Sequence, residues 1–348
     1  MSIRVAINGF GRIGRCILRA IHEQGLQEEF DVVAVNASGD LATNAHLLQY
    51  DTTHGRFHGR VETEGERVLI VEGKRIPFYS TKNPRDIDWA KHDVEILLEC
   101  TGAYASKEKA RALLEQGARR VLISAPGGDD VDATVVMGVN EGTLSPAMTV
   151  VSNASCTTNC LAPVAKVLSE SVGIRQGLMT TIHAYTNDQV TVDVRHKDLR
   201  RARAAAANII PTKTGAARAV GLVLPQLAGR FDGFSLRVPV LNVSLVDLTF
   251  TPERATTKEE INALMTSAAA GPLRGILAVN DAPLVSSDFN HTTASSTFDA
   301  TQTRVLKAAD GATLVKVLAW YDNEWGYSCR MLDVARAWAQ TDDGLRAA

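Results

Sequence analysis

One cysteine of the chain stands among hydroxyl and amide side chains rather than among packing residues. Cys156 lies in the stretch 152–160, Ser-Asn-Ala-Ser-Cys-Thr-Thr-Asn-Cys, and the segment 161–170 that follows has helical spacing. A thiol attacks only as the thiolate, and a helix N-terminus or a nearby imidazole lowers its usual pKa of about 8.5. The sequence therefore predicts Cys156 as a nucleophile. The alternative, a small buried hydrophobe, is disfavoured by the polar neighbours and better describes Cys160, one helical turn further on.

A histidine at the end of a predicted strand is the expected partner of this cysteine. Residues 180–188 read as a strand that runs into a loop, and His183 has polar neighbours on both sides. An imidazole within hydrogen-bond reach of a thiol can stabilise the thiolate and later move a proton. The alternative for any histidine is a role in the core, but its polar setting distinguishes His183 from the other histidines.

Three further segments carry groups suited to binding small anions or amides. Thr214 and Gly215 open a predicted helix that runs to residue 224, where a hydroxyl, free N–H groups and the helix dipole favour an anion. Arg237 is either a structural ion-pair partner or a bidentate phosphate ligand. Asn323, just before the final predicted helix, is placed to donate to a carboxamide near the reaction centre.

The first residues carry a glycine pattern in the correct structural context. Gly9, Gly11 and Gly14 stand between an apolar strand at 3–7 and an amphipathic helix, and a second strand follows at 32–35. This arrangement lets the backbone approach a pyrophosphate at a helix N-terminus. The sequence predicts a dinucleotide site here rather than a chance glycine-rich turn.

The end of the second strand bears on which dinucleotide binds. NAD sites usually place an acidic residue there, whereas NADP sites lack it and offer basic groups. This chain has Ala37, and the first acid, Asp40, lies three residues beyond it. Lys82, in a predicted loop, is either a solvated charge or a cation for a 2′-phosphate. We therefore expect NADP or NAD as the cofactor, with NADP favoured.

The remaining elements of the first half position these groups. Strands are predicted at 68–71, 94–98, 121–123 and 134–137. Ligands of open α/β sheets bind at the carboxyl ends of strands, which makes Thr101 and Ser124 expected cofactor neighbours. Strands and helices alternate over the first 150 residues, so the predicted fold is α/β, with a doubly wound parallel (Rossmann) sheet.

Composition excludes several classes of protein. The 348 residues are 45% hydrophobic and 22% charged, with a net charge of −2, and no lysine and arginine block suggests a nucleic-acid site. No apolar run is long enough to predict a membrane span, and the immediate first strand leaves no room for a signal peptide. Five cysteines at irregular spacing predict reduced thiols in a cytoplasm, and no spacing typical of a metal site occurs.

Six segments resemble, in order and spacing, those of the phosphorylating glyceraldehyde-3-phosphate dehydrogenase family, and the resemblance covers nearly the whole chain. It implies a dinucleotide-binding domain at 1–155, an α+β catalytic domain with a mixed sheet at 156–320, and a C-terminal helix at 321–348 that packs back on the first domain. It also implies a homotetramer that binds glyceraldehyde 3-phosphate and inorganic phosphate. The segments are 7–15, 152–159, 183–189, 196–203, 237–239 and 320–327.

The resemblance also implies roles for individual residues. Cys156 resembles the nucleophile and His183 its activator, and Asn323 the nicotinamide contact. Arg12 and Ile13, inside the glycine motif, are expected to contact the cofactor. The residues that resemble ligands of substrate and of inorganic phosphate are Ser155, Thr157, Thr186, Arg201, Thr214, Gly215 and Arg237.

Two departures from the family pattern reinforce the cofactor prediction. NAD-dependent members carry aspartate where Ala37 stands and commonly proline where Arg195 stands. The resemblance implies that a loop near 185–205 reaches the neighbouring subunit's cofactor, so Arg195 and Lys82 are expected beside a 2′-phosphate.

Three rival functions remain open on the sequence. Erythrose-4-phosphate dehydrogenase shares the cysteine motif, but it departs at 186–187 and 214–215, which this chain keeps. Aspartate-semialdehyde dehydrogenase uses a similar cysteine and histidine with a poorer match. A dinucleotide-sensing or RNA-binding protein would not need intact Cys156, His183 and anion loops.

Overall fold

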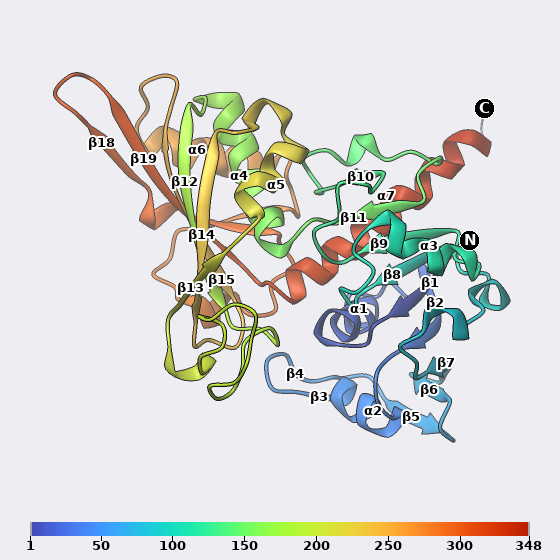
Figure 1. Cartoon of the computed structure of the whole chain (residues 1–348). Helices are drawn as coiled ribbons and strands as arrows, with labels where there is room; N and C mark the ends of the chain where they lie inside the picture. Colours follow the sequence, from blue (N-terminus) through green and yellow to red (C-terminus); the bar gives the residue numbers. More distant parts are fainter. Residues whose placement is uncertain (1, 347–348) are drawn as a thin grey trace. The chain divides into compact units, whose positions relative to one another are not determined.

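The computed structural model describes residues 2–346, which form two compact units (Figure 1). The first unit comprises the chain up to Val135, Glu141–Ala154 and the chain from Ser328 onward. The second comprises Val136–Asn140 and Ser155–Tyr327.

The first unit is built on a nine-stranded sheet in the order β10-β11-β9-β8-β1-β2-β7-β6-β5. The order reverses at β1, which pairs with β2 on one side and β8 on the other, and such a reversal opens a crevice at the carboxyl ends of strands. The parallel strands are β1 (Ile3–Asn8), β2 (Phe30–Asn36), β7 (Lys74–Tyr79), β8 (Ile96–Glu99), β9 (Arg120–Ile123), β10 (Ala133–Thr134) and β11 (Val150–Ser152). Two antiparallel strands, β5 (Val61–Glu64) and β6 (Val68–Val71), extend the sheet beyond β7, and β3 (Tyr50–Asp51) and β4 (Gly55–Arg56) form a separate hairpin.

Apolar periodicity explains the helices of this unit. On α1 (Arg12–Glu23) the side chains of Ile17, Leu18 and Ile21 are buried, as their spacing predicts. The helices α2 (Leu41–Gln49) and α3 (Lys107–Glu115) follow β2 and β8, and side chains of Asp40 and Ser106 cap them.

Two predicted strands differ from the structure. The strand at 68–71 exists as β6, but it is antiparallel and lies outside the parallel part of the sheet. The strand predicted at 134–137 ends at Thr134, because the Val136 N–H donates to the Asn140 side chain at 2.8 Å and the chain turns.

The second unit contains a mixed eight-stranded sheet. Its path is β13-β14-β12-β15-β19-β17-β16, with β18 paired to β19. Along β15 and β19, buried residues alternate with partly exposed ones, so one face packs inward and the other is uncovered. The strands are β12 (Gln176–Ala184), β13 (Ile210–Lys213), β14 (Phe231–Val238), β15 (Ser244–Thr251), β16 (Leu277–Asn280), β17 (Ser296–Asp299), β18 (Arg304–Lys307) and β19 (Thr313–Tyr321). The helices are α4 (Cys156–Ser171), α5 (Ala216–Val223) and α6 (Lys258–Ala270). The predicted pairing of a doubly wound sheet with an α+β unit is therefore confirmed.

Arg120 is one of several residues that anchor the last helix, α7 (Trp325–Arg346), within the first unit, and an ion pair between Arg336 and Glu29 is another contact. Arg120 Nη1 donates to the Trp338 carbonyl at 3.2 Å, and the guanidinium lies 5.2 Å from the centre of the Trp338 ring. Across residues 2–346, no helix has both the length and the apolarity that a membrane span needs.

Candidate active site

Cys156 is the first residue of helix α4. Ser155 caps the helix, since its Oγ accepts the Thr158 N–H at 3.1 Å, and Ala154 before it has a left-handed φ of 54°. The helix thus begins at the cysteine itself, five residues earlier than the predicted spacing. The residue keeps some exposed surface, while its thiol faces the interior and the N–H groups of Cys156 and Thr157.

His183, on β12, directs its imidazole to the thiol. Its Nε2 lies 3.5 Å from Cys156 Sγ, and its Nδ1 lies 2.6 Å from the Ala184 carbonyl oxygen. A carbonyl only accepts, so this short contact favours a hydrogen on Nδ1, with Nε2 as the acceptor that faces the thiol. That tautomer is the one that a general base needs.

Arg237 lies beside the same imidazole. It is the register partner of His183 in the parallel β12–β14 pair, and its Nη1 donates to the Ala184 carbonyl at 2.9 Å. The same Nη1 is 2.9 Å from His183 Nδ1, and because a guanidinium only donates, it competes with the Ala184 carbonyl, at 2.6 Å, for that nitrogen. A fixed positive charge therefore stands next to both the base and the nucleophile.

Burial and this charge set the protonation states. Burial raises the pKa of the Cys156 thiol, while the Arg237 charge and hydrogen bonds from Thr157 act in the opposite direction. Burial, assisted by Arg237, lowers the pKa of His183 to about 3. The expected lowering of the thiol pKa is therefore wrong for this structure, because burial outweighs the helix terminus. The resting pair is a thiol that faces a neutral imidazole.

Tyr321, which the sequence did not single out, holds the other side of this site. Its hydroxyl lies 2.9 Å from Thr157 Oγ1 and 2.7 Å from Thr181 Oγ1, and its ring meets His183 edge-on at 5.9 Å. The Thr157 hydroxyl, predicted as a phosphate ligand, is thus already engaged and buried. Alternation of inward and outward residues along β19 turns Tyr321 inward. This alternation was the signal in the sequence that could have identified it.

Arg201 acts on the site through its charge. Its Nε donates to Thr212 Oγ1 at 2.8 Å, and it forms an ion pair with Asp188. The Arg201 charge contributes to the lowered pKa of His183. Thr186, on the same loop, is exposed, and its N–H donates to the Gln189 side chain at 2.8 Å.

The remaining predicted residues of this unit stand at an element terminus, beside Ser244 or on an exposed loop. Thr214 Oγ1 accepts the Ala216 N–H at 3.2 Å, and Gly215 is the exposed N-cap of α5. Asn323 Oδ1 accepts the Ser244 hydroxyl at 2.7 Å, and Ser244 Oγ in turn accepts the Ala184 N–H at 3.0 Å. Arg195 is exposed on the loop that follows β12. The structure thus joins Cys156, His183 and Arg237 by direct contact, and Thr186, Arg201, Thr214 and Asn323 bond to other residues.

The glycine motif in the first unit fits a dinucleotide. A Cβ on Gly9, whose φ is 100°, would stand 2.6 Å from the Cys100 carbonyl carbon, and one on Gly14 would stand 2.1 Å from the Gly9 carbonyl oxygen. Gly11, by contrast, is exposed, and a Cβ there would meet no protein atom within 4 Å. Gly9 and Gly14 are thus required by the fold, whereas Gly11 keeps open the N-terminus of α1, where a pyrophosphate would bind.

The two residues after Gly11 stand in the first turn of α1. Arg12 forms an ion pair with Asp51, and Ile13 is partly buried. Because their N–H groups belong to the first turn, both residues can donate to a phosphate through the main chain.

The end of β2 has no acidic side chain for a ribose. Ala37 is buried, and its N–H donates to the Tyr79 carbonyl at 3.0 Å. The Asp40 carboxylate accepts the Thr43 N–H at 2.7 Å as the cap of α2, and this bond lowers its pKa. Lys82 is exposed on the loop after β7.

Sequence reasoning missed a buried carboxylate at the end of β8. Glu99 is fully buried and accepts hydrogen bonds from the Asn8 side chain and from both the N–H and the hydroxyl of Thr101. Ser124, at the end of the next strand, donates its N–H to the Glu99 carbonyl at 2.9 Å. The available signal was that Asn8, Asn36 and Glu99 each end a parallel strand.

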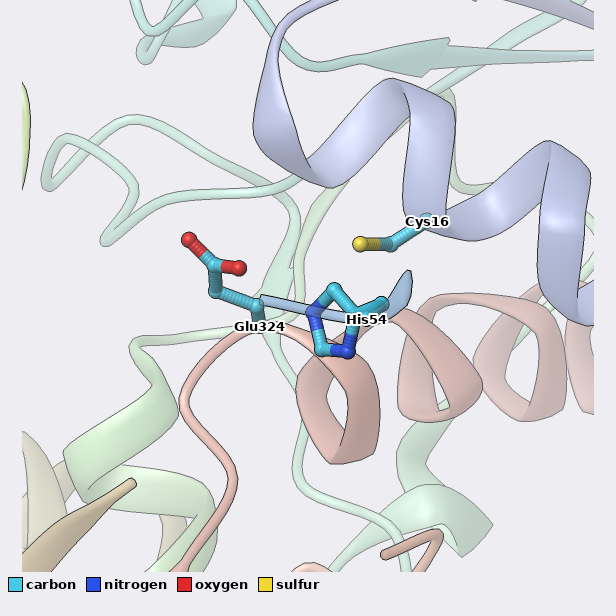
Figure 2. A group of neighbouring side chains, drawn as sticks. All are labelled: Cys16, His54 and Glu324. Carbon is cyan, nitrogen blue, oxygen red and sulfur yellow. The ribbon is translucent and has the colours of Figure 1, made fainter. Parts of the chain in front are cut away.

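The first unit also brings together a thiol and an imidazole outside these sites. Cys16, on α1, and His54, in the β3–β4 turn, place ligand atoms within 4.8 Å of each other (Figure 2). Glu324, also labelled there, belongs to the second unit. A sulfur and one nitrogen are too few ligands for a structural metal site, so this pair is not assigned a metal.

Comparisons with known proteins agree across the chain. Residues 3–107 match the family model described as "Glyceraldehyde 3-phosphate dehydrogenase, NAD binding domain", and residues 155–323 match that of the C-terminal domain. The chain is 60% identical to the plasmid glyceraldehyde-3-phosphate dehydrogenase of Cupriavidus necator over 339 residues, which cover 97% of this chain and 99% of that protein. It is 56% identical to glyceraldehyde-3-phosphate dehydrogenase of Pseudomonas aeruginosa over 343 residues, 99% of this chain and all of the relative.

Proposed function

Because the chain belongs to the glyceraldehyde 3-phosphate dehydrogenase family, we propose that it oxidises the aldehyde of D-glyceraldehyde 3-phosphate and transfers the acyl group to inorganic phosphate, which gives 1,3-bisphosphoglycerate. The observation that carries this proposal is the 3.5 Å approach of Cys156 Sγ to His183 Nε2, with Nδ1 held by the Ala184 carbonyl. Both family models and the relatives named above bear the triose name, so erythrose 4-phosphate is not favoured as the substrate.

The geometry supports a covalent mechanism. Cys156 Sγ bonds to the aldehyde carbon while its proton passes through His183 Nε2 to the carbonyl oxygen, which gives a hemithioacetal. His183 Nε2 then accepts the hydroxyl proton as the C–H bond releases a hydride, and a thioester remains. NAD or NADP, held at the glycine loop of Gly9, Gly11 and Gly14, would supply the hydride acceptor. A phosphate oxygen attacks the thioester carbon, the C–S bond breaks, and the thiolate recovers its proton.

Two anion sites serve the two phosphates of this reaction. The phosphate of the substrate is proposed to bind Arg237, Thr186 and Arg201. Arg237 contacts the catalytic histidine directly, and the charge of Arg201 acts on the same site. Ser155, Thr157, Thr214 and Gly215 are proposed to hold the attacking phosphate, at the N-termini of α4 and α5. Because Tyr321 engages the Thr157 hydroxyl, Thr157 contributes its main-chain N–H.

NADP is the proposed preferred cofactor. No carboxylate stands at position 37 to repel a 2′-phosphate, and Asp40 is committed to capping α2. Lys82 is exposed on the neighbouring loop and supports NADP as a cation for the 2′-phosphate. Arg195 is proposed to add a second cation from a neighbouring subunit. Asn323 is proposed to donate to the carboxamide of the nicotinamide.

A homotetramer is proposed from the family and from the uncovered face of the second sheet. Leu178, Phe234 and Leu314 are 69%, 49% and 43% exposed on outward-facing positions of β12, β14 and β19. Exposed apolar side chains on an outward sheet face support a subunit interface there. The first unit is proposed to bind the dinucleotide and the second to hold the substrate, in a cytoplasm where the five cysteines stay as thiols.

Initial rates test the proposal. Purified protein is given glyceraldehyde 3-phosphate with and without inorganic phosphate, and reduction of NAD and of NADP is followed. We expect phosphate-dependent reduction, with kcat/KM for NADP at least equal to kcat/KM for NAD. We also expect kcat/KM for glyceraldehyde 3-phosphate to lie far above kcat/KM for erythrose 4-phosphate. Cys156→Ser should nearly abolish turnover and still bind the cofactor. Normal turnover in that variant would end the covalent proposal.

A further inference from the structure

The buried carboxylate of Glu99 closes a directed chain of hydrogen bonds across three strands of the first sheet. At its far end, Asn36 Oδ1 accepts the Thr81 N–H at 3.1 Å, while Asn36 Nδ2 donates to the Thr81 carbonyl at 3.1 Å and to Asn8 Oδ1 at 2.8 Å. Asn8 Nδ2 then donates to Glu99 Oε2. From the Thr81 N–H through Asn36 and Asn8, each donor therefore points toward Glu99, while the second Asn36 hydrogen returns to the Thr81 carbonyl.

Main-chain groups fix the direction of the chain at both ends. Thr81 offers one N–H and one carbonyl, so the Asn36 amide fits in only one orientation, and that orientation sets Asn8. At the near end, Glu99 Oε1 accepts the Thr101 N–H at 2.8 Å. Both carboxylate oxygens thus face N–H donors, an arrangement that favours the ionised carboxylate.

The chain connects the loops that surround the proposed dinucleotide. Asn8 precedes Gly9 of the glycine loop, and Asn36 precedes Ala37. Thr81 precedes Lys82, and Thr101 packs against Gly9, since a Cβ on Gly9 would meet the Thr101 nitrogen at 2.6 Å. One buried side chain therefore sets the relative positions of four loops.

We propose that Glu99 is a positioning residue for the dinucleotide, and that it discriminates in favour of the 2′-phosphorylated form by fixing the Thr81–Lys82 loop. This inference rests on the proposed function, because it presupposes that the glycine loop binds NAD or NADP. Burial raises the pKa of Glu99 while the bonds from Thr101 and Asn8 oppose the rise, so the ionised form depends on this hydrogen-bond chain.

Glu99→Gln tests the proposal with almost no change in shape. An amide nitrogen at either oxygen position faces an N–H group of Asn8 or Thr101, and reversing Asn8 and Asn36 only moves the mismatch to Thr81. Loss of a charge-assisted bond corresponds to roughly a tenfold weakening or more. We expect the dissociation constant of NADP, measured by calorimetry, to rise about tenfold, that of NAD to rise less, and kcat at saturating cofactor to stay within a factor of about two.

A double variant separates positioning from general damage. If Glu99 acts through the Lys82 loop, the loss of NADP affinity in Lys82→Ala should be smaller in the Glu99→Gln background than in the parent protein. The proposed discrimination would be overturned if the losses of NADP affinity in the two single variants added fully in the double variant. Equal weakening of NAD and NADP binding by Glu99→Gln would overturn it as well. Unchanged affinity for both cofactors would overturn the positioning role.

A milder variant keeps the test decisive if Glu99→Gln does not fold. Thr101→Val removes the hydroxyl of an exposed side chain and keeps the Thr101 N–H bond to Glu99. The bond that this hydroxyl accepts from the Ala103 N–H, at 3.0 Å, is lost as well. We expect a fewfold rise in the NADP dissociation constant at an unchanged melting temperature, and no rise would contradict the proposal. If the parent protein itself bound neither dinucleotide, the proposed function would fail instead.

Discussion

The carbonyl oxygen of Gly9 lies 2.1 Å from the point where a Cβ atom on Gly14 would stand. That approach leaves no room for any side chain at Gly14, whereas Gly11, three residues earlier, faces no protein atom within 4 Å. The glycines of one motif therefore have different roles: Gly14 permits close packing, and Gly11 leaves space for a ligand.

Alanine substitutions should distinguish these two roles. We expect Gly14→Ala to destabilise the fold by about 1–3 kcal/mol, as overpacking does. Gly11→Ala, at a permitted φ of −76°, should melt near the parent temperature and weaken dinucleotide binding on the order of tenfold. Thermal unfolding and calorimetric titration check both. Equal melting temperatures for the two variants would contradict the packing argument.

Arg237 should control the reactivity of Cys156. Its charge opposes the raised pKa of the thiol, so Arg237→Leu should raise that pKa further and slow alkylation by iodoacetamide at neutral pH. Arg254→Leu, which removes an exposed arginine paired with Glu260, is the matched control. An alkylation profile unchanged by Arg237→Leu would show that the charge does not reach the sulfur.

His183 should leave a signature in acid stability as well as in catalysis. Its pKa is about 3 in the folded chain against an ordinary 6.5, so between these values the unfolded state binds a proton that the folded state does not. Stability contributed by the neutral imidazole is therefore present above pH 6.5 and is lost as the pH falls toward 3. Denaturant titrations should show a steeper acid loss for the parent than for His183→Asn. The slope difference should approach about 1.4 kcal/mol per pH unit at most.

The same variant should slow the reaction without weakening cofactor binding. Loss of a general acid–base is expected to lower kcat on the order of 10²- to 10⁴-fold. Single-turnover reduction of the cofactor measures this directly. A kcat within a factor of a few of the parent value would remove His183 from the proposed mechanism.

Ala37→Asp should reverse the cofactor preference. A carboxylate at the end of β2 would repel the 2′-phosphate and accept the ribose hydroxyls, so kcat/KM should fall at least about tenfold with NADP and rise with NAD. Lys82→Ala is the companion variant, expected to weaken NADP alone. If NADP kinetics survive both changes, the 2′-phosphate is held elsewhere.

Local sequence was sufficient for the features that depend on neighbours along the chain. The strand, glycine loop and helix at 3–23 follow from periodicity and spacing, and the turn before Cys156 predicts a thiol at a helix start. His183 was identifiable because its strand ends in polar residues. The α/β class followed from the alternation of these elements.

Features that depend on burial or on strand order could not be predicted. The raised pKa of Cys156 results from its surroundings in the folded unit, not from the adjacent residues. Glu99 reads as an ordinary acid until β1, β2 and β8 are placed side by side, and Tyr321 acquires a role only when β19 lies near Thr157 and Thr181. The strand expected at 134–137 ends at Thr134 because the Val136 N–H donates to the Asn140 side chain, a bond that sequence periodicity does not reveal.

The register of β12 and β14 places His183 directly opposite Arg237. Their juxtaposition is held by main-chain hydrogen bonds of a sheet, whereas Thr186 and Arg201 stand on the 185–205 loop. Exchange of that loop between relatives would therefore change which molecule is held while leaving the proton-transfer machinery in place. The 185–205 loop can therefore vary between relatives, whereas the paired strands β12 and β14 must keep their register.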